Sequence, residues 1–406
     1  MSPAPSSAVL ITAMCVGLFF GVLGFAAFPA LMPVFFDEWG LDNTEAGWVN
    51  GLYFLGYLLA VPALVGATDR IDTRRVFIAS LLVSTCAAFG FAAFAQGFWT
   101  ASAFRVLAGV GLAGTFLPGM RLLVERLEGR TQYRAVAYFA AAFGIGASVS
   151  YVLAGEIEAR FGWPWAFAAT GPGPLVQIVI ALVFVRGAAR PTGTGSRSGF
   201  PNFRAVLANR RVMGYVLAGT GHLWELMAVR AWTVTFLVFA FARYGDSAPP
   251  WRATTLAMVI GLCGVVGIVT GGELGVRFQR KRVLMIIQAL SAVLACVIGF
   301  AAALPFWGLF ALFIAYGLVI NADSSLVYAG TMANAPERLR GAAMAVHGTV
   351  SFMGGFAGPL IAGVVLDATG GGVTVASWGF AFASAGLAAA AGCLMVAVLD
   401  SGRDDG

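Results

Sequence analysis

The chain has 406 residues, of which 59% are hydrophobic and only 11% are charged, and its formal net charge at pH 7 is +6. Because a soluble domain carries about a quarter charged residues, this composition excludes an ordinary soluble protein and is typical of a protein built for lipid. The positive charge is spread over short loops between apolar segments, so it does not indicate a nucleic-acid partner.

Twelve apolar segments follow one another along the chain, and each is long enough to cross a bilayer core, for which a helix needs roughly 20 residues. Backbone groups in hydrocarbon must bond within their own segment, and these segments are too long and too uniformly apolar for barrel strands. The sequence therefore predicts an all-α membrane protein. The predicted spans are residues 8–36, 46–67, 76–95, 98–120, 135–155, 164–185, 212–241, 253–274, 283–303, 305–329, 341–365 and 375–399.

The basic residues fall mainly on alternate connections between these spans. Twenty of the 25 cations lie on one side, and only Arg160, Arg243 and Arg252 lie on the other. The positive-inside rule therefore predicts that the basic side, with both termini, is cytoplasmic. The first span is not expected to be a signal peptide, because its leader MSPAPSS has no basic region. A multi-pass protein of a bacterial inner (plasma) membrane is expected, since a single lysine, Lys281, is typical of a GC-rich genome.

A stretch rich in Gly, Ser, Pro and Arg, residues 187–211, divides the twelve spans six and six. An internal duplication supports this division. Arg70 and Arg277, in the loops after the second and eighth spans, are 207 positions apart, and the segments YRAVAYFA and LRGAAMAV are 206 positions apart. Two loops with nearly one offset indicate parallel repeats. The expected organisation is a six-helix bundle over 1–186, a cytoplasmic linker over 187–211, and a second six-helix bundle over 212–406.

Three segments resemble signatures of the major facilitator superfamily, and the resemblance extends over essentially the whole chain. In GGELGVRFQRKR the glycine, leucine and basic residues fall as in the family's loop signature, Gly-x-Leu-Ala-Asp-Arg-x-Gly-Arg-Arg. The pair Asp69 and Arg70 in TDRIDTRR fits the same pattern, and RVLAGVGLAG, beginning at Arg105, resembles the family's Arg-x-x-x-Gly-x-Gly segment. The resemblance implies two six-helix bundles related by a pseudo-twofold axis, which move a solute by alternating access.

The resemblance also implies that the two loops gate the cytoplasmic side. An aspartate near a helix end and several arginines on a tight loop can pair with one another and with neighbouring helix ends. Neither copy is complete, because Val276 replaces the signature's aspartate, and Asp72 and Gln279 replace its glycine. The alternative is a pair of solvated basic loops that only set the topology. The candidate gating residues are Asp69, Arg70, Arg74, Arg277 and Arg280.

The seventh span contains three ionisable residues in GHLWELMAVRAW: His222, Glu225 and Arg230. A charged residue at mid-helix costs about 2.5 to 3.5 kcal/mol on insertion scales, so these side chains are expected to face protein or water. At about 100° per residue, they share one arc of the helix. The remaining buried charges are Arg105 on the fourth span and Asp323 on the tenth. The resemblance implies a central cavity lined mainly by the first, fourth, seventh and tenth helices, so these five are the candidate substrate-binding and coupling residues.

Each candidate has a plainer alternative. Arg230 lies about 27 Å from the cytoplasmic end of its helix and can equally snorkel to the outer headgroups. Arg105 and Glu225 can each belong to a structural salt bridge, and His222 can be a packing group instead of a partner for Glu225 one turn away. Asp323 lies closer to the cytoplasm and can be a gate, a proton relay, or a residue that bonds its own helix.

Patterns that resemble cofactor or metal motifs have plainer explanations. GVGLAG, residues 109–114, matches the dinucleotide fingerprint but lies within a predicted helix, so its glycines and those of GGFAGPLIAG, residues 354–363, are expected to let helices pack closely. The five cysteines stand singly in separate spans, and the two histidines form no H-E-x-x-H pattern, which predicts no metal site. No nucleophile and base stand at a recognisable spacing, so neither an enzyme activity nor a cofactor is expected.

The sequence predicts a proton-coupled secondary transporter of a small organic solute, with an anionic solute favoured. Arg105 and Arg230 would attract the negative charge, and Glu225 would carry the proton, because a carboxylate shielded from water can load and release protons as access alternates. Organic anions are favoured over nitrate and nitrite, whose carriers resemble one another in arginines on the second and eighth helices, where this chain has none. The proton gradient is the expected driving force, and the expected partners are the solute and the bilayer, with a monomeric chain.

Two alternatives remain open. A proton-antiport exporter of drugs or metabolites is less favoured, because family exporters often have a Gly-Pro motif on the fifth helix and FGIGASVSYVLAG has no proline. A membrane sensor that moves nothing would need a partner-binding surface, and the longest soluble stretch is the short central linker. The substrate itself is not readable from the pattern, because transporters of one fold recognise unrelated molecules through a few side chains.

Overall fold

The computed structural model describes residues 6–68, 70–185, 203–245 and 249–400, and all the regular elements within these ranges are helices. Eleven of the described helices are long and apolar enough to cross a membrane, and the shorter apolar helix α1 (Ser7–Gly21) precedes them. The predicted all-α membrane fold is therefore confirmed. Eleven long spans and α1 together match the twelve predicted segments.

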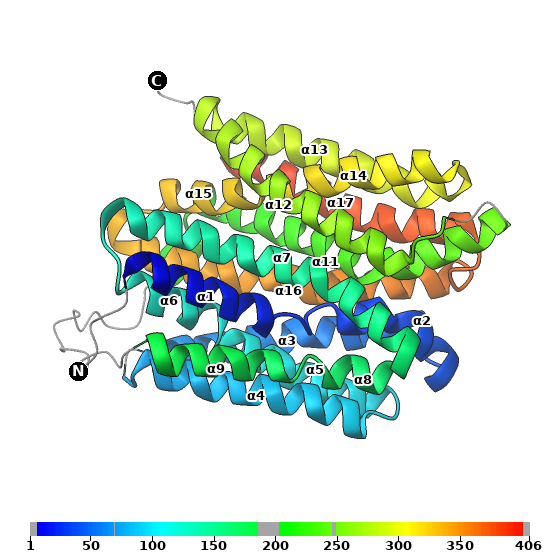
Figure 1. The fold of residues 1–406 in the computed structure, drawn as a ribbon. Coiled ribbons are helices and arrows are strands. Elements are labelled where there is room, and N and C mark those ends of the chain that lie inside the picture. The colour runs from blue at the N-terminus through cyan, green and yellow to red at the C-terminus, as the bar shows by residue number, and fades with distance from the viewer. Residues whose placement is uncertain (1–5, 69, 186–202, 246–248, 401–406) are drawn as a thin grey trace. The chain divides into compact units, whose positions relative to one another are not determined.

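The first of two compact units is formed by the segments Met1–Leu41, Leu52–Ser196 and Thr254–Gly261. Within this unit α1 packs against α7 and α9, and α4 packs against α5, α8 and α9 (Figure 1). Its helices are α1 (Ser7–Gly21), α2 (Ala27–Trp39), most of α3 (Asn43–Ala67), α4 (Thr73–Phe94), α5 (Phe98–Ala113), α6 (Phe116–Val124), α7 (Gly129–Phe161), α8 (Trp163–Ala168) and α9 (Pro172–Phe184).

The second unit is formed by Asp42–Gly51, Arg197–Ala253 and Leu262–Gly406. Its central element is α11, which packs against α15, α16 and α17 and is the most deeply buried of the spans. Besides the start of α3, its helices are α10 (Phe203–Leu207), α11 (Arg210–Tyr244), most of α12 (Ala253–Arg277), α13 (Arg280–Ile298), η2 (Gly299–Ala303), α14 (Phe306–Ala322), α15 (Ser324–Asn334), η3 (Glu337–Leu339), α16 (Arg340–Ala368) and α17 (Val375–Leu399).

Four of the predicted spans are interrupted, each dividing into two helices. A break in a membrane helix is tolerated where the freed backbone groups are buried in protein and find new partners. At the first break, for example, the amide of Ala26 donates a hydrogen bond to the hydroxyl of Ser150 at 2.9 Å. These breaks were not predicted, because hydropathy reports length and not backbone continuity. The divided spans are 8–36, 98–120, 164–185 and 305–329.

Close glycine contacts bring neighbouring helices together, as predicted for the two glycine-rich segments. A Cβ atom added at Gly109 of α5 would overlap the carbonyl oxygen of Tyr53 on α3, and one added at Gly354 of α16 would overlap that of Thr220 on α11. The backbones touch at both places, so only glycine fits. The first contact fixes the position of the site in the first unit, because Arg105 lies one turn before Gly109.

Candidate functional site

Arg105 of α5 is a buried cation in the first unit, with only 4% of its surface exposed. Its guanidinium carbon lies 4.3 Å from the ring centre of Tyr53 and 5.7 Å from that of Phe28. No carboxylate pairs with it among the described residues, and its Nε is buried without a hydrogen-bond partner. A salt bridge, the plainer explanation of this arginine, therefore has no partner in the described part of the chain. The charge is stabilised in part by the faces of the rings.

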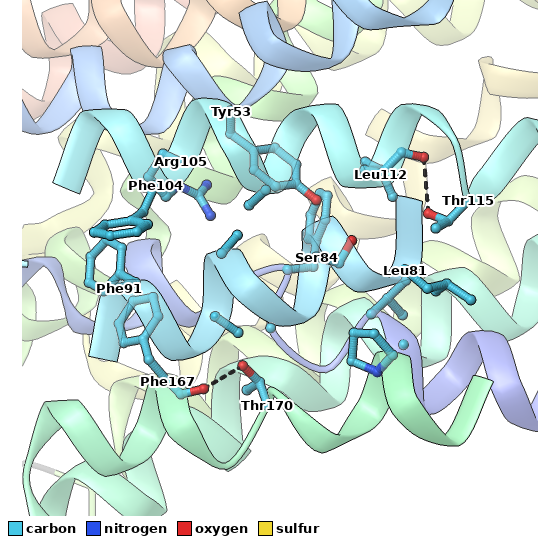
Figure 2. Close-up of a pocket in the computed structure, with 18 of the residues that line it drawn as sticks. Tyr53, Leu81, Ser84, Phe91, Phe104, Arg105, Leu112, Thr115, Phe167 and Thr170 are labelled. Carbon is cyan, nitrogen blue, oxygen red and sulfur yellow. Dashed lines mark hydrogen bonds between the residues drawn. The ribbon is translucent and has the colours of Figure 1, made fainter. Parts of the chain in front are cut away.

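A cavity of about 70 Å³ opens beside Arg105. Figure 2 shows Arg105 next to Tyr53, with the rings of Phe91, Phe104 and Phe167 gathered at the same end of the cavity. Phe91 and Phe167 are stacked, with ring centres 3.9 Å apart. A cavity of this volume is large enough to hold several water molecules where its lining offers polar partners, as Arg105 and Thr170 do. The remaining lining residues, from helices of this unit and the turns beside them, are Gly21, Val22, Gly24, Phe25, Leu81, Ser84, Ala87, Ala88, Ala108, Leu112, Thr115, Thr170, Pro174 and Gln177.

This arrangement can receive an anion. A guanidinium presents five N–H donors in a planar fork that matches a carboxylate, and here the Nε donor has no acceptor among the described residues. Burial of a charge is costly unless it is paired, so an anion entering the cavity would be attracted strongly. The aromatic walls add apolar surface for the rest of a ligand. The first unit therefore contains an anion-accepting pocket with an aromatic lining.

Glu225 of α11 is held in a different way, inside the second unit. It is 2% exposed, and its Oε1 accepts two hydrogen bonds at 2.8 Å each, from the hydroxyl of Ser291 on α13 and from that of Tyr316 on α14. No donor bonds the other oxygen, Oε2, among the described residues. Two hydroxyl donors on one oxygen leave the second oxygen as the place where a proton can bind.

His222 and Asp323 form a pair one helical turn away from Glu225. The Nδ1 atom of His222 lies 2.7 Å from Oδ1 of Asp323, and its Nε2 lies 3.1 Å from the hydroxyl of Ser324. Asp323 stands at the break between α14 and α15, and its Oδ2 accepts a hydrogen bond of 3.0 Å from the side-chain amide of Gln288 on α13. Both members of the pair are buried, so the imidazole and the carboxyl group interact with little screening by water.

The structure brings three of the five predicted candidates together. His222, Glu225 and Asp323 lie in one region of the second unit, where the two carboxylates are close enough to interact electrostatically. Arg105 lies in the first unit, and Arg230 is partly buried on α11, outside the two clusters just described. These three side chains lie in the interior of the second unit, beside α13 and α14. The sequence analysis had expected them on the wall of a central cavity, and that placement stays a prediction.

Three residues of these clusters were missed in the sequence. Gln288 and Ser291 are two polar residues three positions apart on an apolar helix, a spacing that places them on one face and that could have found them. Tyr316 gave no comparable signal. An isolated tyrosine in a span is more often a packing or interfacial residue, and only the coordinates show a charge beside it.

The first candidate gating loop connects α3 to α4. Asp69 lies outside the described residues, and Arg70 is exposed. Arg74 donates from Nη2 to the carbonyl of Leu182 at the end of α9, 3.0 Å away, while the side chain of Asp72 caps α4 by accepting the amide of Arg74 at 2.9 Å. This loop therefore joins the start of α4 to the end of a neighbouring helix, and its role as a gate stays a prediction.

The second candidate loop connects α12 to α13. Arg277 pairs with Glu273 one turn earlier at 2.7 Å, and Arg280 donates to the carbonyl of Ala329 on α15 at 3.2 Å. The loop lacks an aspartate at Val276, and an acid beside its Lys281 comes from Asp400, just after α17. Its carboxylate accepts the hydroxyl of Tyr215 at 3.2 Å and lies 3.5 Å from Arg211 and 3.7 Å from Lys281.

The Asp400 contacts join the ends of α11, α13 and α17. An acid near the C-terminus thus supplies charge to the basic loop from outside the signature. Sequence comparison with the signature could not find it, because the two segments are separated by more than a hundred positions.

Comparison with known proteins identifies a family and several relatives. The model of the Major Facilitator Superfamily matches residues 14–270 and 248–405. The niacin transporter NiaP of Acinetobacter baylyi is 27% identical over 175 residues, which are 43% of this chain and 40% of that protein. The gentisate transporter of Corynebacterium glutamicum is 24% identical over 346 residues, 81% of this chain and 74% of that protein.

A multidrug resistance protein B homolog of Mycobacterium tuberculosis is 28% identical over 154 residues, 37% of this chain and 28% of that protein. The chain thus matches less than two thirds of the length of several of these relatives, NiaP included.

Solved structures share the fold. A bacterial homolog of the human lysosomal transporter Spinster, in an inward-facing and unoccupied conformation, superposes with a TM-score of 0.75 at 15% identity, covering 98% of this chain and 96% of that chain. The nucleoside transporter NupG superposes with a TM-score of 0.75 at 14% identity, covering 97% and 100%. These relatives and structural neighbours are transporters and not enzymes.

Proposed function

The chain belongs to the major facilitator superfamily, and from this premise we propose that it is a secondary active transporter of a small organic anion, driven by the proton gradient. Its two repeats would expose the solute to each side of the membrane in turn, as parallel-repeat carriers do. The proposed location is a bacterial inner membrane, in which the protein acts as a monomer.

The proposal of an anionic substrate rests on the surroundings of Arg105. Its guanidinium is buried, no carboxylate among the described residues pairs with it, and its Nε has no acceptor there; such a buried charge is costly, and a bound anion would reduce that cost. Truncating one partner of a buried, hydrogen-bonded charge pair typically costs about 2 to 5 kcal/mol. An anion at Arg105 is therefore expected to contribute a large part of the binding free energy.

The aromatic lining favours carboxylates that carry a ring. Three relatives are named as transporters of niacin, gentisate and 4-hydroxybenzoate, all of which are aromatic carboxylic acids. An apolar cavity of about 150 Å³ can hold benzene, whereas the cavity beside Arg105 measures about 70 Å³. We infer that the pocket takes the carboxylate end of the solute and that the ring packs at its aromatic edge.

Glu225 is the proposed proton carrier. Its Oε1 is held by Ser291 and Tyr316, which leaves Oε2 to take up a proton in a buried setting. A buried carboxylate that alternates between its charged and neutral forms can couple its load to the side of the membrane that is open.

The test is binding and uptake by the purified protein. Reconstituted into liposomes, the wild type is expected to accumulate labelled benzoate or 4-hydroxybenzoate when the outside is acidic, and to bind neither benzamide nor phenol comparably. Arg105→Gln is expected to weaken binding roughly 30-fold or more. Arg160→Gln is the matched control, because Arg160 is an exposed cation that pairs with Glu156 one turn away. Equal affinity of Arg105→Gln and wild type for every carboxylate tested would contradict the proposal.

Export is the second candidate, and it is supported by the relatives named as a multidrug resistance protein homolog and an efflux pump. The same liposomes decide between the two directions. An importer accumulates solute with protons moving inward together with it, whereas an antiporter accumulates solute only when protons leave the compartment that the solute enters.

A further inference from the structure

Two layers of polar side chains cross the interior of the second unit on the same helices. The first layer is Glu225 with Ser291, and the second is the pair of His222 and Asp323 with Gln288. His222 precedes Glu225 by three residues on α11, and Gln288 precedes Ser291 by three residues on α13. Each step of three residues is about 4.5 Å along a helix axis, so the two layers are stacked one turn apart.

Gln288 has a fixed orientation in the second layer. Its Nε2 donates to Oδ2 of Asp323 at 3.0 Å and to the carbonyl of Ala218 on α11 at 3.2 Å, so both amide hydrogens are used. Its Oε1 is buried and has no hydrogen-bond partner. Rotation of the amide by half a turn would place Oε1 against the carboxylate oxygen of Asp323, which is unfavourable while Asp323 is charged. In the orientation shown, the amide nitrogen faces a carboxylate oxygen of Asp323.

The unpartnered Oε1 has a simple consequence. An unpartnered buried acceptor is costly, and the cost disappears when a donor arrives. A proton on Asp323 would supply that donor after rotation of the Gln288 amide, because the O–H of a carboxylic acid can donate to Oε1. Gln288 is thus arranged to stabilise Asp323 in both of its protonation states, through Nε2 in one and Oε1 in the other.

We propose that the pair of His222 and Asp323 is a second proton-binding station, one helical turn from Glu225, and that Gln288 is the residue that positions it. This inference rests on the proton-driven transport proposed above. It adds a second station to the single carboxylate that such transport requires, and it places the whole proton path inside the second unit. The anion pocket at Arg105 then needs no protonatable group of its own.

The proton balance of the path is simple. A proton from water binds Oε2 of Glu225 and converts the carboxylate to a neutral acid. It then passes to the second station, where the carboxylate of Asp323 takes it up beside the neutral imidazole of His222, and Glu225 is again charged. The proton leaves to water on the other side, and Asp323 returns to the charged form. The other titratable groups within electrostatic reach are Tyr316 on α14, Cys296 on α13 and His347 on α16.

Two measurements on liposomes separate proton coupling from solute handling. Counterflow of labelled against unlabelled benzoate at equal pH on both sides needs binding and alternation of the site but no net proton movement. Accumulation in a pH gradient needs binding and alternation of the site together with net proton movement. Asp323→Asn is expected to retain counterflow and to lose accumulation, because the amide cannot take up a proton.

Gln288→Met tests the positioning role. We expect it to retain counterflow within about twofold, to lower the accumulation ratio, and to displace the pH of half-maximal uptake by about half a unit or more, the size that loss of one hydrogen bond produces. The control is Asn321→Leu on α14, since the amide of Asn321 bonds only the carbonyl of Gly317 in its own helix, at 3.1 Å. A structural role alone would lower protein yield or thermal stability without moving the pH profile.

A second pair of variants distinguishes a change in proton binding from a general effect of losing a buried polar group. Ser291→Ala removes a donor from Glu225, whereas Thr233→Val removes a buried hydroxyl that bonds only the carbonyl of Val229 in α11, at 2.6 Å. Displacement of the pH profile by Gln288→Met and Ser291→Ala, but not by Asn321→Leu and Thr233→Val, supports the second station. Wild-type accumulation and pH profile in Asp323→Asn and Gln288→Met overturn it while leaving the proposed function standing. Failure of the wild type to accumulate any carboxylate in a pH gradient overturns the proposed function as well.

Discussion

The two units bury charge in opposite ways. In the first, Arg105 lies beside aromatic rings and a cavity, with no carboxylate among the described residues to neutralise it. In the second, Glu225 and Asp323 accept hydrogen bonds from α13 and α14. Both arrangements bear a desolvation cost of several kcal/mol for each ion, which aromatic rings offset in part in the first unit and hydrogen-bond donors offset in the second.

The difference indicates what each charge is for. A cation that keeps its donors free can be compensated by a ligand that arrives and leaves, whereas a carboxylate whose donors are permanent can change only by taking up a proton. The proposed function accordingly places solute recognition in the first unit and the driving ion in the second. Variants at residues of each unit test this division, and the largest effect is expected at Glu225.

Replacement of Glu225 should separate the two activities most completely. In Glu225→Gln the hydroxyls of Ser291 and Tyr316 keep an oxygen to bond, but the side chain no longer accepts a proton. Accumulation of carboxylate in a pH gradient should fall to the level of simple equilibration, while counterflow and binding remain. Glu156→Gln, at an exposed ion pair, is the control. Persistent accumulation in Glu225→Gln would show that the proton is carried elsewhere.

A change at Gly109 should damage the first unit alone. A Cβ atom in Gly109→Ala would overlap the carbonyl oxygen of Tyr53, so α5 must move away from α3 and take Arg105 with it. Overpacking of this kind costs about 1 to 3 kcal/mol, and we expect a lower melting temperature together with weaker carboxylate binding. The matched control is Gly66→Ala on α3, where an added Cβ atom meets no heavy atom within 4 Å. Unchanged melting and binding in Gly109→Ala would mean that the helices tolerate separation.

The ring of Tyr53 should matter less than the charge beside it. Tyr53→Phe keeps an aromatic face under the guanidinium, whereas Tyr53→Leu removes it. A cation–π contact is worth about 0.5 to 2 kcal/mol, so Tyr53→Leu should weaken carboxylate binding about two- to thirtyfold and Tyr53→Phe by less than that. Isothermal titration with 4-hydroxybenzoate measures both. A loss in Tyr53→Phe equal to that in Tyr53→Leu would assign the effect to the hydroxyl and not to the ring.

Sequence reasoning found the fold and the charged residues for one physical reason: hydrocarbon tolerates few charges and no unbonded backbone. Both rules act on residue types along the chain, so twelve spans and five ionisable residues could be read directly. What surrounds each charge depends on helix contacts that hydropathy does not encode. Glu225 was therefore found, but its donors Ser291 and Tyr316 were not, and the break at Asp323 was read as continuous helix.

The candidate gating loops also make contacts that the sequence pattern could not predict. Arg74 and Arg280 were selected for their place in a signature, and both bond carbonyl groups of neighbouring helices. The acid beside Lys281 comes from Asp400, which no local pattern could connect to that loop. A motif predicts the residues that belong to it, and it does not predict the distant residues that contact them.

A carboxylate that is well bonded but exposed should matter least, which tests whether burial is what distinguishes the two units. Asp367 on α16 accepts two hydrogen bonds from Asn43, of 3.3 and 2.7 Å, and two from Thr44, of 2.7 and 2.6 Å, at the start of α3. A charge at an exposed helix N-terminus contributes about 0.3 to 1 kcal/mol. Asp367→Asn should therefore lower the melting temperature by only about 1 to 3 °C and leave accumulation and its pH profile unchanged. The comparison variant is Glu273→Gln, at an exposed pair with Arg277. A loss of proton-driven accumulation in Asp367→Asn would show that an exposed carboxylate can carry the coupling, and burial would no longer separate a driving charge from a structural one.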